Sequence, residues 1–388
     1  MSHVARDALT DFPAQPLPPW RRAVLKVGSS LLAGFADGDG DGGLDARHAR
    51  DLAHFVQAAR AAGREVVLVS SGAVAAGRAR VASAGEGLVL RQALAALGQA
   101  QLIGFWQALL SVPVAQVLLS HDDLRDRRRY LNARATLREL LRLGALPLIN
   151  ENDTVAVDEL KLGDNDNLAA AAASLVDADL LLIATDIGGL YSADPARDAR
   201  AVPQPRIARI TPRLLAAAAA AAGRIGTGGM RTKLEAAAKA ATAGIATALF
   251  CGRDAEVVAA LRADRLHGTL IERADNTLSA RKQWLRHAPA AGQLTVDAGA
   301  AAALCAQGAS LLPGGVVAVA GEFHRGDVVE VHAGEHALAR GLAQYSASEL
   351  RRIAGHKSGD IESILGFRYG EAVIHRDDLV LLVHGAMP

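Results

Sequence analysis

Short apolar runs alternate with longer, alanine-rich amphipathic stretches from Arg22 to about Ile271, and this alternation limits the possible folds most strongly. Six runs have the length and composition of buried strands: 23–27, 65–70, 112–119, 145–150, 179–185 and 246–251. Five stretches between them suit helices: 45–62, 90–110, 130–143, 167–176 and 232–243. Continuous apolar strands that alternate with helices are typical of a parallel sheet covered on both faces. With right-handed crossovers, the sequence predicts an open, mostly parallel αβα sandwich.

The pattern changes after Ile271. The following stretch is polar and rich in turn residues, and beyond it come short predicted strands (293–297, 315–321, 327–333 and 371–375) with helices at 298–307 and 348–353. The first 20 residues contain four prolines, which argue against a helix, and we expect a loose, disordered tail there. The predicted organisation is a tail (1–20), a large α/β domain (21–272), a linker (273–291) and a small β-rich domain (292–388).

Composition excludes several classes of protein. Of the 388 residues 51% are hydrophobic, so a sizeable core is available and global disorder is excluded. The formal net charge of +1 gives no bulk attraction to nucleic acid or anionic membranes, although a local patch on the small domain stays open. Cys251 and Cys305 are far apart in sequence and predict two reduced thiols. Because we find no signal peptide and no run of about 20 apolar residues, we expect a soluble, cytoplasmic protein.

Two small-residue turns follow the first two predicted strands. Ligands of open α/β sheets bind beyond the carboxyl ends of the strands, so these turns are candidate sites. The first turn, 26–30, begins with Lys26 and continues with Gly28 and Ser29, which offer a cation and backbone N–H groups to a phosphoryl group. A surface lysine before a turn is the competing interpretation. The second turn, 70–77, contains Ser71, which can donate a hydrogen bond to a substrate carboxylate, or else only joins strand to helix.

Two polar clusters follow the fourth predicted strand. Residues 150–153 and 163–167 together place eight acids and amides within 18 positions. Helix capping explains one or two of these residues but not all eight. Carboxylates suit the ammonium group of an amino acid, and amides suit its α-carboxylate. We therefore expect the zwitterionic end of an amino acid to bind here.

A glycine-rich turn opens the last predicted helix of the large domain. The string GTGGMRTK at 226–233 combines a helix N-terminus with a lysine and predicts a phosphate cradle. A Walker A motif, a G-x-S-x-G elbow and a Rossmann fingerprint are absent from the sequence. Positioning and charge neutralisation are the main demands of phosphoryl transfer, and two lysines on two glycine turns meet the second demand. The glycine- and aspartate-rich stretch 37–43 begins like a calcium loop, but its twelfth position is His48, so we expect only a solvated loop.

Taken together, these strings resemble the amino acid kinase family. The strings that carry the resemblance are KVGSS, SSGAVAAG, INENDTV, KLGDNDNLAA, LLLIATDIGGLYSADP and GTGGMRTKLEAA. The C-terminal strings GASLLPGG and FHRGD resemble a PUA domain, a fold often found in RNA-modifying proteins. Among amino acid kinases, this appendage points to enzymes that phosphorylate glutamate.

The resemblance implies roles for individual residues. Lys26 and Lys233 would contact the phosphates and stabilise the transferring group, and Asp164 would organise the two lysines. Glutamate would be bound by Ser71, Asn150, Asp153 and Asn165. The nucleotide pocket would be lined by Lys26, Gly28, Ser29, Thr185, Asp186, Thr227, Gly228, Gly229, Met230, Arg231, Thr232 and Lys233.

The implied reaction is ATP-dependent phosphorylation of the γ-carboxylate of glutamate, the first step of proline synthesis, with Mg²⁺ carried on ATP and no metal site on the protein. Proline is the expected feedback inhibitor, and we expect a homo-oligomer. One alternative is a related kinase that acts on N-acetylglutamate or carbamate, although an N-acetyl group would need an apolar pocket. The other is an RNA-binding protein whose PUA-like domain is the working part, which the near-neutral charge disfavours.

Overall fold

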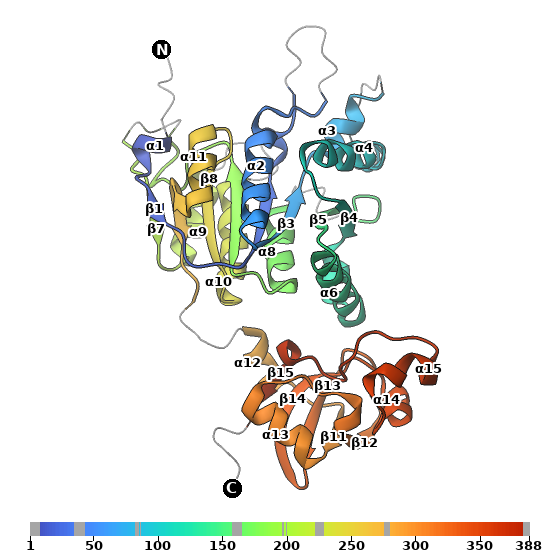
Figure 1. Ribbon diagram of the computed structural model, residues 1–388. Helices are drawn as coiled ribbons and strands as arrows, with labels where there is room; N and C mark the ends of the chain where they lie inside the picture. Colours follow the sequence, from blue (N-terminus) through green and yellow to red (C-terminus); the bar gives the residue numbers. More distant parts are fainter. Residues whose placement is uncertain are drawn as a thin grey trace. The chain divides into compact units, whose positions relative to one another are not determined.

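The computed structural model describes residues 8–34, 43–81, 85, 87–156, 165–195, 198, 200–221, 229–274 and 280–382. The chain forms two compact units, residues 1–275 and 276–388. Figure 1 shows the elements of each unit, coloured along the chain.

The first unit is built on an eight-stranded sheet, ordered β4-β5-β3-β2-β6-β8-β10-β7. Its strands are β2 (Arg22–Val27), β3 (Glu65–Ser70), β4 (Val114–Leu119), β5 (Leu146–Glu151), β6 (Leu180–Thr185), β7 (Arg206–Ile207), β8 (Ala246–Cys251) and β10 (Gly268–Ile271). All neighbours are parallel except β8 and β10, which are antiparallel. The predicted mostly parallel sheet is confirmed, and all six predicted strands belong to it.

Helices cover both faces of this sheet, as predicted for an αβα sandwich (Figure 1). The helices are α2 (Arg47–Ala61), α3 (Ala73–Arg78), α4 (Leu88–Leu109), α5 (His121–Arg125), α6 (Arg127–Arg142), α8 (Asn165–Leu175), α9 (Pro212–Ala221), α10 (Met230–Thr242) and α11 (Ala255–Ala260). Successive side chains of a strand point to opposite faces, so β2 contributes Leu25 to the core under α2 and Val24 to the core under α8 and α10. Lys26 shares the second face with Val24.

The N-terminal segment corrects the expectation of a loose tail over residues 1–20. Residues 1–7 lie outside the described residues, but α1 (Ala8–Asp11) and β1 (Gln15–Pro16) are regular, and β1 pairs with β9 (Arg265–Leu266). Phe12, Leu17 and Trp20 are all buried. Prolines prevent a helix here but not an extended segment, and burial of three large side chains holds that segment against the domain.

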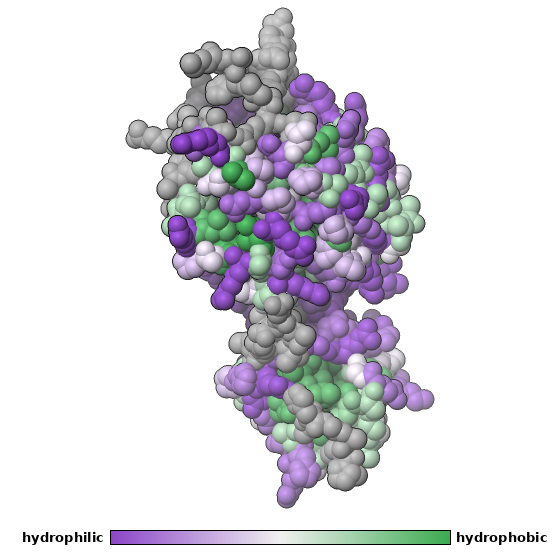
Figure 2. All heavy atoms as spheres, turned by 90° about the vertical axis from the view of Figure 1, so that its left-hand side faces the viewer, coloured by the Kyte–Doolittle hydropathy of each residue, from purple (hydrophilic) through white to green (hydrophobic). Residues whose placement is uncertain are grey.

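Helix α4 differs from the expectation that the chain has no apolar segment long enough to cross a membrane. Over its 22 residues, this helix meets the length and composition criteria for a membrane span. It nevertheless packs against α3 within the folded unit and buries Leu94, Leu102 and Trp106 in that unit. We therefore identify α4 as a core helix of the domain. Figure 2 shows the side of the molecule where α1 and β7 lie, and there hydrophilic side chains surround a hydrophobic patch on the first unit.

The second unit is a five-stranded sheet, ordered β12-β11-β13-β14-β15, around a separate apolar core. Its strands are β11 (Gly292–Val296), β12 (Val316–Gly321), β13 (Val328–Ala333), β14 (His336–Leu342) and β15 (Leu379–Leu381), and its helices are α12 (Ala280–His287), α13 (Ala298–Gln307), α14 (Ala347–Ile353) and α15 (Ile361–Leu365). Strands β11 and β13 are parallel, and the other neighbours are antiparallel.

Two expectations for this part of the chain need correction. The stretch 371–375 is not a strand: it forms one isolated bridge, from Ile374 to Leu311, and its apolar side chains are buried in the core. Residues 280–287, expected within a linker, form α12 instead. This helix packs on β14 and β15, and Arg286 donates a hydrogen bond to the Leu381 carbonyl.

Candidate active site

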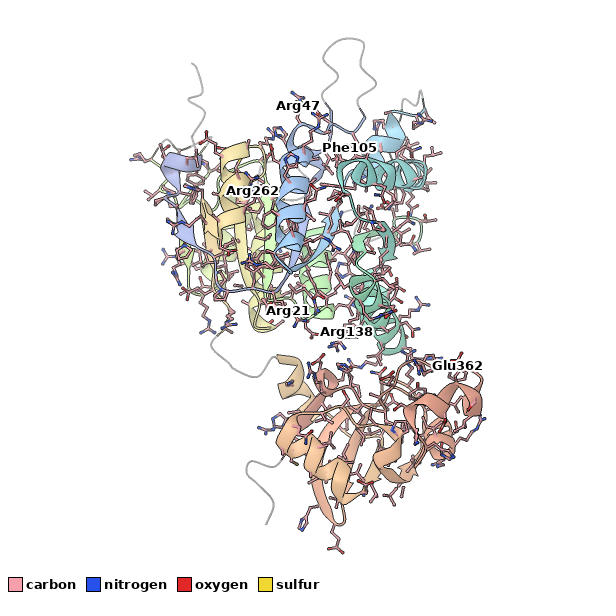
Figure 3. All side chains as sticks on the ribbon, in the orientation of Figure 1. Arg21, Arg47, Phe105, Arg138, Arg262 and Glu362 are labelled. Carbon is pink, nitrogen blue, oxygen red and sulfur yellow. The ribbon has the colours of Figure 1, made fainter. Side chains whose placement is uncertain are left out.

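Strand β2 lies at the centre of the first sheet, where the order of strands along the chain reverses. The next strand in the sequence, β3, pairs with one edge of β2, and the later strand β6 pairs with its other edge. Arg21, before β2, and Arg47, at the start of α2, lie at opposite ends of the unit in Figure 3, so the carboxyl end of β2 faces the Arg47 end. A ligand of an open α/β sheet binds at such a switch point, beyond the carboxyl ends of the strands.

A buried carboxylate joins two lysines at this position. Asp166, in the first turn of α8, lies 2.6 Å by its Oδ1 from Nζ of Lys26 and 3.4 Å by its Oδ2 from Nζ of Lys233. Thr232 donates a hydrogen bond of 2.8 Å to the same Oδ2 atom. The triad therefore links β2, α8 and α10 in one ion-pair network.

The charges in this network support one another. Burial would raise the pKa of Asp166, but Lys26 and Lys233 outweigh that effect together and hold the pKa below its ordinary value. Burial lowers the pKa of Lys233, and attraction to Asp166 opposes that shift. Asp166 is thus ionised at neutral pH and keeps two cationic groups close together at the edge of the sheet.

The N-terminus of α10 lies beside these lysines. Gly229 precedes the helix with an extended backbone, and its carbonyl accepts a hydrogen bond of 2.9 Å from Thr232. The first turn of a helix presents free N–H groups and a partial positive charge, which suit a phosphate. Residues 222–228, with Thr227 and Gly228, lie outside the described residues, whereas Met230 and Arg231 form the first turn.

On the β2 side, Gly28 follows the same lysine. A Cβ atom at Gly28 would lie 3.6 Å from Nζ of Lys26, so this turn passes close to the ammonium group. Ser29 begins the short 3-10 helix that follows. Lys26 therefore has small residues beside it, and its Nζ is close to exposed backbone.

A chain of amide side chains lies at the carboxyl ends of β3 and β5. Nδ2 of Asn165 donates to Oγ of Ser71 at 2.7 Å and to Oδ1 of Asn150 at 3.1 Å. Nδ2 of Asn150 in turn donates to Oε1 of Gln99 at 2.9 Å. The structure thus brings together three residues predicted to bind substrate, and it adds Gln99 from the buried face of α4.

Asp153 lies two residues after the end of β5. Burial raises the pKa of Asp153 to about 6, and the positive charge of Arg91 partly opposes the shift. Asp153 is therefore mostly ionised at neutral pH, in surroundings that would favour a partner cation. Asp164 lies outside the described residues, so its predicted role as organiser of the lysines stays a prediction, and the described residue that contacts both lysines is Asp166.

The small residues in the turn after β3 are required by backbone conformation and by helix packing. Gly72 has a φ of 116°, a conformation that favours glycine. A Cβ atom on Gly77 would lie 1.9 Å from the Leu94 carbonyl oxygen, and one on Gly98 would lie 1.9 Å from the Ala73 carbonyl oxygen. Gly77 is therefore required because α3 and α4 pack closely together. Close approach of the backbone to a ligand is not the reason.

A pocket of ≈ 260 Å³ opens next to the α10 N-terminus. Its lining is mostly apolar and comprises Ile187, Gly189, Leu190, Tyr191, Ser192, Ala193, Asp194, Pro195, Gln204, Leu214, Ala217, Ala218, Gly229 and Met230. Thr185 ends strand β6, Asp186 follows it, and Thr185 donates a hydrogen bond of 3.2 Å to Asp186. The first unit therefore places an apolar pocket beside a cationic turn.

Sequence reasoning missed three features of this site. Asp166 belongs to the quoted string GDNDN, but its neighbours Asp164 and Asn165 were assigned roles instead. Gln99 is one polar residue in an apolar helix, and no local signal distinguishes it from a solvated residue. The pocket lining between 187 and 218 is mostly apolar and joins residues from the stretch 187–195 to Gln204 and to residues of α9, so only folding brings them together.

Comparison with known proteins shows the family of this chain. The model of the amino acid kinase family matches residues 21–251, and the model of the PUA domain matches residues 292–365. This chain belongs to the amino acid kinase family. A glutamate 5-kinase of Xylella fastidiosa strain M23 is 61% identical over 380 residues, which cover 96% of this chain and 98% of that protein.

Other relatives give the same picture of this family member. A glutamate 5-kinase of Xanthomonas euvesicatoria pv. vesicatoria strain 85-10 is 64% identical over 367 residues, covering 92% of this chain and 100% of that protein. Among solved structures, UMP kinase from Bacillus anthracis aligns with 68% of this chain and 99% of that chain, at 15% identity and a TM-score of 0.45. The amino acid kinase domain therefore lies within the first unit and the PUA domain within the second.

Proposed function

We propose that this kinase transfers the γ-phosphoryl group of ATP to the γ-carboxylate of L-glutamate, forming γ-glutamyl phosphate and ADP. The observation that carries the proposal is the Lys26–Asp166–Lys233 network beside the Ser71–Asn165–Asn150 chain. The first group of side chains suits phosphates and the second suits an amino acid. The two lie next to each other because Asn165 and Asp166 are consecutive in α8.

The chemistry needs little from the protein besides position and charge. A γ-carboxylate has a pKa near 4.3, so it is already ionised at neutral pH and its oxygen attacks the γ-phosphorus without a general base. The bond from phosphorus to the bridging oxygen breaks, and the electron pair leaves with ADP. Lys26 and Lys233 donate hydrogen bonds to phosphoryl oxygens and stabilise the charge that spreads over them. Asp166 keeps the two ammonium groups at the required position.

The donors beside the pocket fit ATP. The α10 N-terminus and two lysines provide N–H groups and positive charge for phosphates, and the apolar pocket next to them suits a base. Mg²⁺ prefers oxygen ligands and is usually bound by substrate phosphates, so we propose that it enters with ATP. Bound Mg²⁺ would neutralise part of the phosphate charge.

A substrate panel tests the proposal. ADP release would be measured with ATP and L-glutamate, N-acetylglutamate, L-aspartate or carbamate as acceptor. We expect L-glutamate to give the highest kcat/KM, because Asp153 and the amide chain suit a free ammonium and an α-carboxylate. A preference for N-acetylglutamate would contradict the proposal.

We also propose that proline inhibits by competing with glutamate, since both present an ammonium and an α-carboxylate in similar geometry. Initial rates at several concentrations of both compounds measure this. An effect of proline on kcat at saturating glutamate would instead indicate a separate regulatory site. Action in the cytoplasm and assembly as a homo-oligomer remain part of the proposal.

The alternative of an RNA-binding protein receives no comparable support from the first unit. A gel-shift assay of the full chain with RNA at physiological salt tests it separately. Binding of RNA would assign a further role to the PUA domain without altering the kinase proposal.

A further inference from the structure

The direction of the hydrogen bonds in the amide chain determines whether the substrate contacts a hydrogen-bond donor or an acceptor. An amide has a donor end and an acceptor end, so each bond in the chain constrains the next. Both hydrogens of Asn165 Nδ2 are used, one by Ser71 and one by Asn150. The atom of Asn165 that is left for a substrate is therefore Oδ1, an acceptor.

The same direction determines the role of Ser71. Its Oγ atom accepts a hydrogen bond from Asn165, so its hydroxyl hydrogen is available for another partner. An acceptor suits an ammonium group, and a hydroxyl hydrogen suits a carboxylate. With the opposite direction, Asn165 would present a donor to the ammonium, which would be repulsive.

Gln99 lies at the other end of the chain. Its Oε1 atom accepts from Asn150 Nδ2, so Oδ1 of Asn150 must face Asn165. Gln99 and Asn150 are both buried: Asn150 has both ends of its amide paired, whereas Nε2 of Gln99 has no hydrogen-bond partner among the described residues. The backbone of Gln99 is held by its neighbour Gly98, which packs directly on the Ala73 carbonyl at the start of α3. Helix α3 in turn begins two residues after Ser71.

We propose that Gln99 is a positioning residue that sets the direction of this chain, so that Asn165 presents an oxygen to the substrate ammonium and Ser71 a hydrogen to its α-carboxylate. The inference rests on the proposed function, because it names the two ends of glutamate. Gln99 itself does not touch the substrate. It acts through Asn150 and Asn165.

The test compares two substitutions at one position. Gln99→Leu keeps the approximate volume but removes the acceptor, so Asn150 Nδ2 loses its partner. We expect the KM for glutamate to rise about tenfold, the equivalent of about 1.4 kcal/mol, with the KM for ATP changed less than about twofold. Gln99→Glu keeps an acceptor for Asn150 and should restore much of the glutamate affinity.

A glutamine on the same helix provides the matched control. Among the described residues, the Gln107 side chain bonds to the backbone of residues 110, 112 and 114, so Gln107→Leu should leave both KM values unchanged. Thermal melting of each variant shows whether α4 remains packed.

The outcomes separate the two proposals. A wild-type chain inactive with glutamate would overturn the proposed function, and the same comparison would then be made with the acceptor that the substrate panel identifies. An active wild-type chain whose glutamate KM is unchanged by Gln99→Leu would overturn the positioning role. A parallel rise in both KM values, or Gln99→Glu as poor as Gln99→Leu, would also overturn it, because the effect would then come from displaced packing.

Discussion

At the scale of single residues, the site depends on charges that the fold holds out of water. Lys26, Asp166 and Lys233 are all nearly buried, and each lone charge would be costly to bury there. Together they form a network with a net charge of +1, and this remaining positive charge attracts a phosphate group. We therefore expect the function to depend on the three residues as a unit.

Lys26→Ala should lower kcat about 10²-fold or more, with a much smaller effect on the KM for glutamate, because the charge matters most in the transition state. Steady-state rates with both substrates varied measure this. Lys239→Ala, on an exposed position of α10, is the control and should be close to wild type. Near-normal turnover of Lys26→Ala would remove this lysine from the mechanism.

Asp153 predicts a pH dependence of glutamate use. Its pKa of about 6 lies above the ordinary value, so the carboxylate is lost as pH falls through 6 and is fully present above it. At saturating ATP, kcat/KM for glutamate should fall roughly tenfold between pH 7 and pH 5, since this ratio reports ionisations of the free enzyme. Asp153→Asn should have a raised glutamate KM and a flatter profile. An unchanged profile in that variant would assign the titration to another group.

At the scale of elements, the packing of α3 on α4 joins the two sides of the substrate site. Both helices approach backbone to backbone at Gly77 and Gly98. Helix α4 contributes Gln99 to one end of the amide chain, and Ser71, at the other end, lies in the turn that leads into α3. The geometry of the site therefore requires glycine at both Gly77 and Gly98. Both glycines are visible in the sequence, but the reason for them becomes clear only when the two helices are packed together.

Gly98→Ala should destabilise the domain by about 1–3 kcal/mol and raise the KM for glutamate, because the new methyl group overlaps the Ala73 carbonyl. Gly104→Ala on the same helix is a matched control. A Cβ atom there meets nothing within 4 Å, so this change should stabilise the helix by up to about 1 kcal/mol. Thermal melts and glutamate kinetics measure both. Equal melting temperatures for the two variants would contradict the packing argument.

At the scale of the whole molecule, the residues assigned to the site all belong to the first unit. Every residue assigned to the site precedes residue 234, and the first unit ends at residue 275. Each unit has its own apolar core. The first unit therefore has the properties of an independently folding domain.

A chain of residues 1–275 should fold, melt cooperatively and keep glutamate-dependent ADP release. The cut removes α12, which belongs to the second unit. A chain of residues 1–266 is the control: it lacks β10, the strand between β8 and β7, and should be insoluble or unfolded. A soluble, cooperatively melting but inactive 1–275 fragment would show that the second unit contributes to catalysis.

Much of the fold follows from local pattern. The six apolar runs from 23–27 to 246–251 became strands of one sheet, and the helices between them appeared within a few residues of their predicted ends, because burial on both faces gives a parallel strand a strong signal. The two-residue strands β7 and β9 were missed, and so was β14, which lies inside the second sheet between β13 and β15. The N-terminal segment was misjudged because its three buried side chains are separated by prolines and carry no periodicity.

The residue types of the site could be read from the sequence, because strand ends of a parallel sheet meet at one edge. Lys26, Ser71, Asn150, Asn165 and Lys233 did meet there. The partners of each side chain depended on tertiary structure. Contact of Asp166 with both lysines requires α8 to pack on both β2 and α10, and the position of Gln99 depends on the glycine contact between α3 and α4. Sequence alone thus determined which chemistry was present, whereas hydrogen-bond direction and ion pairing, which act over about 3 Å between distant segments, were decided by packing.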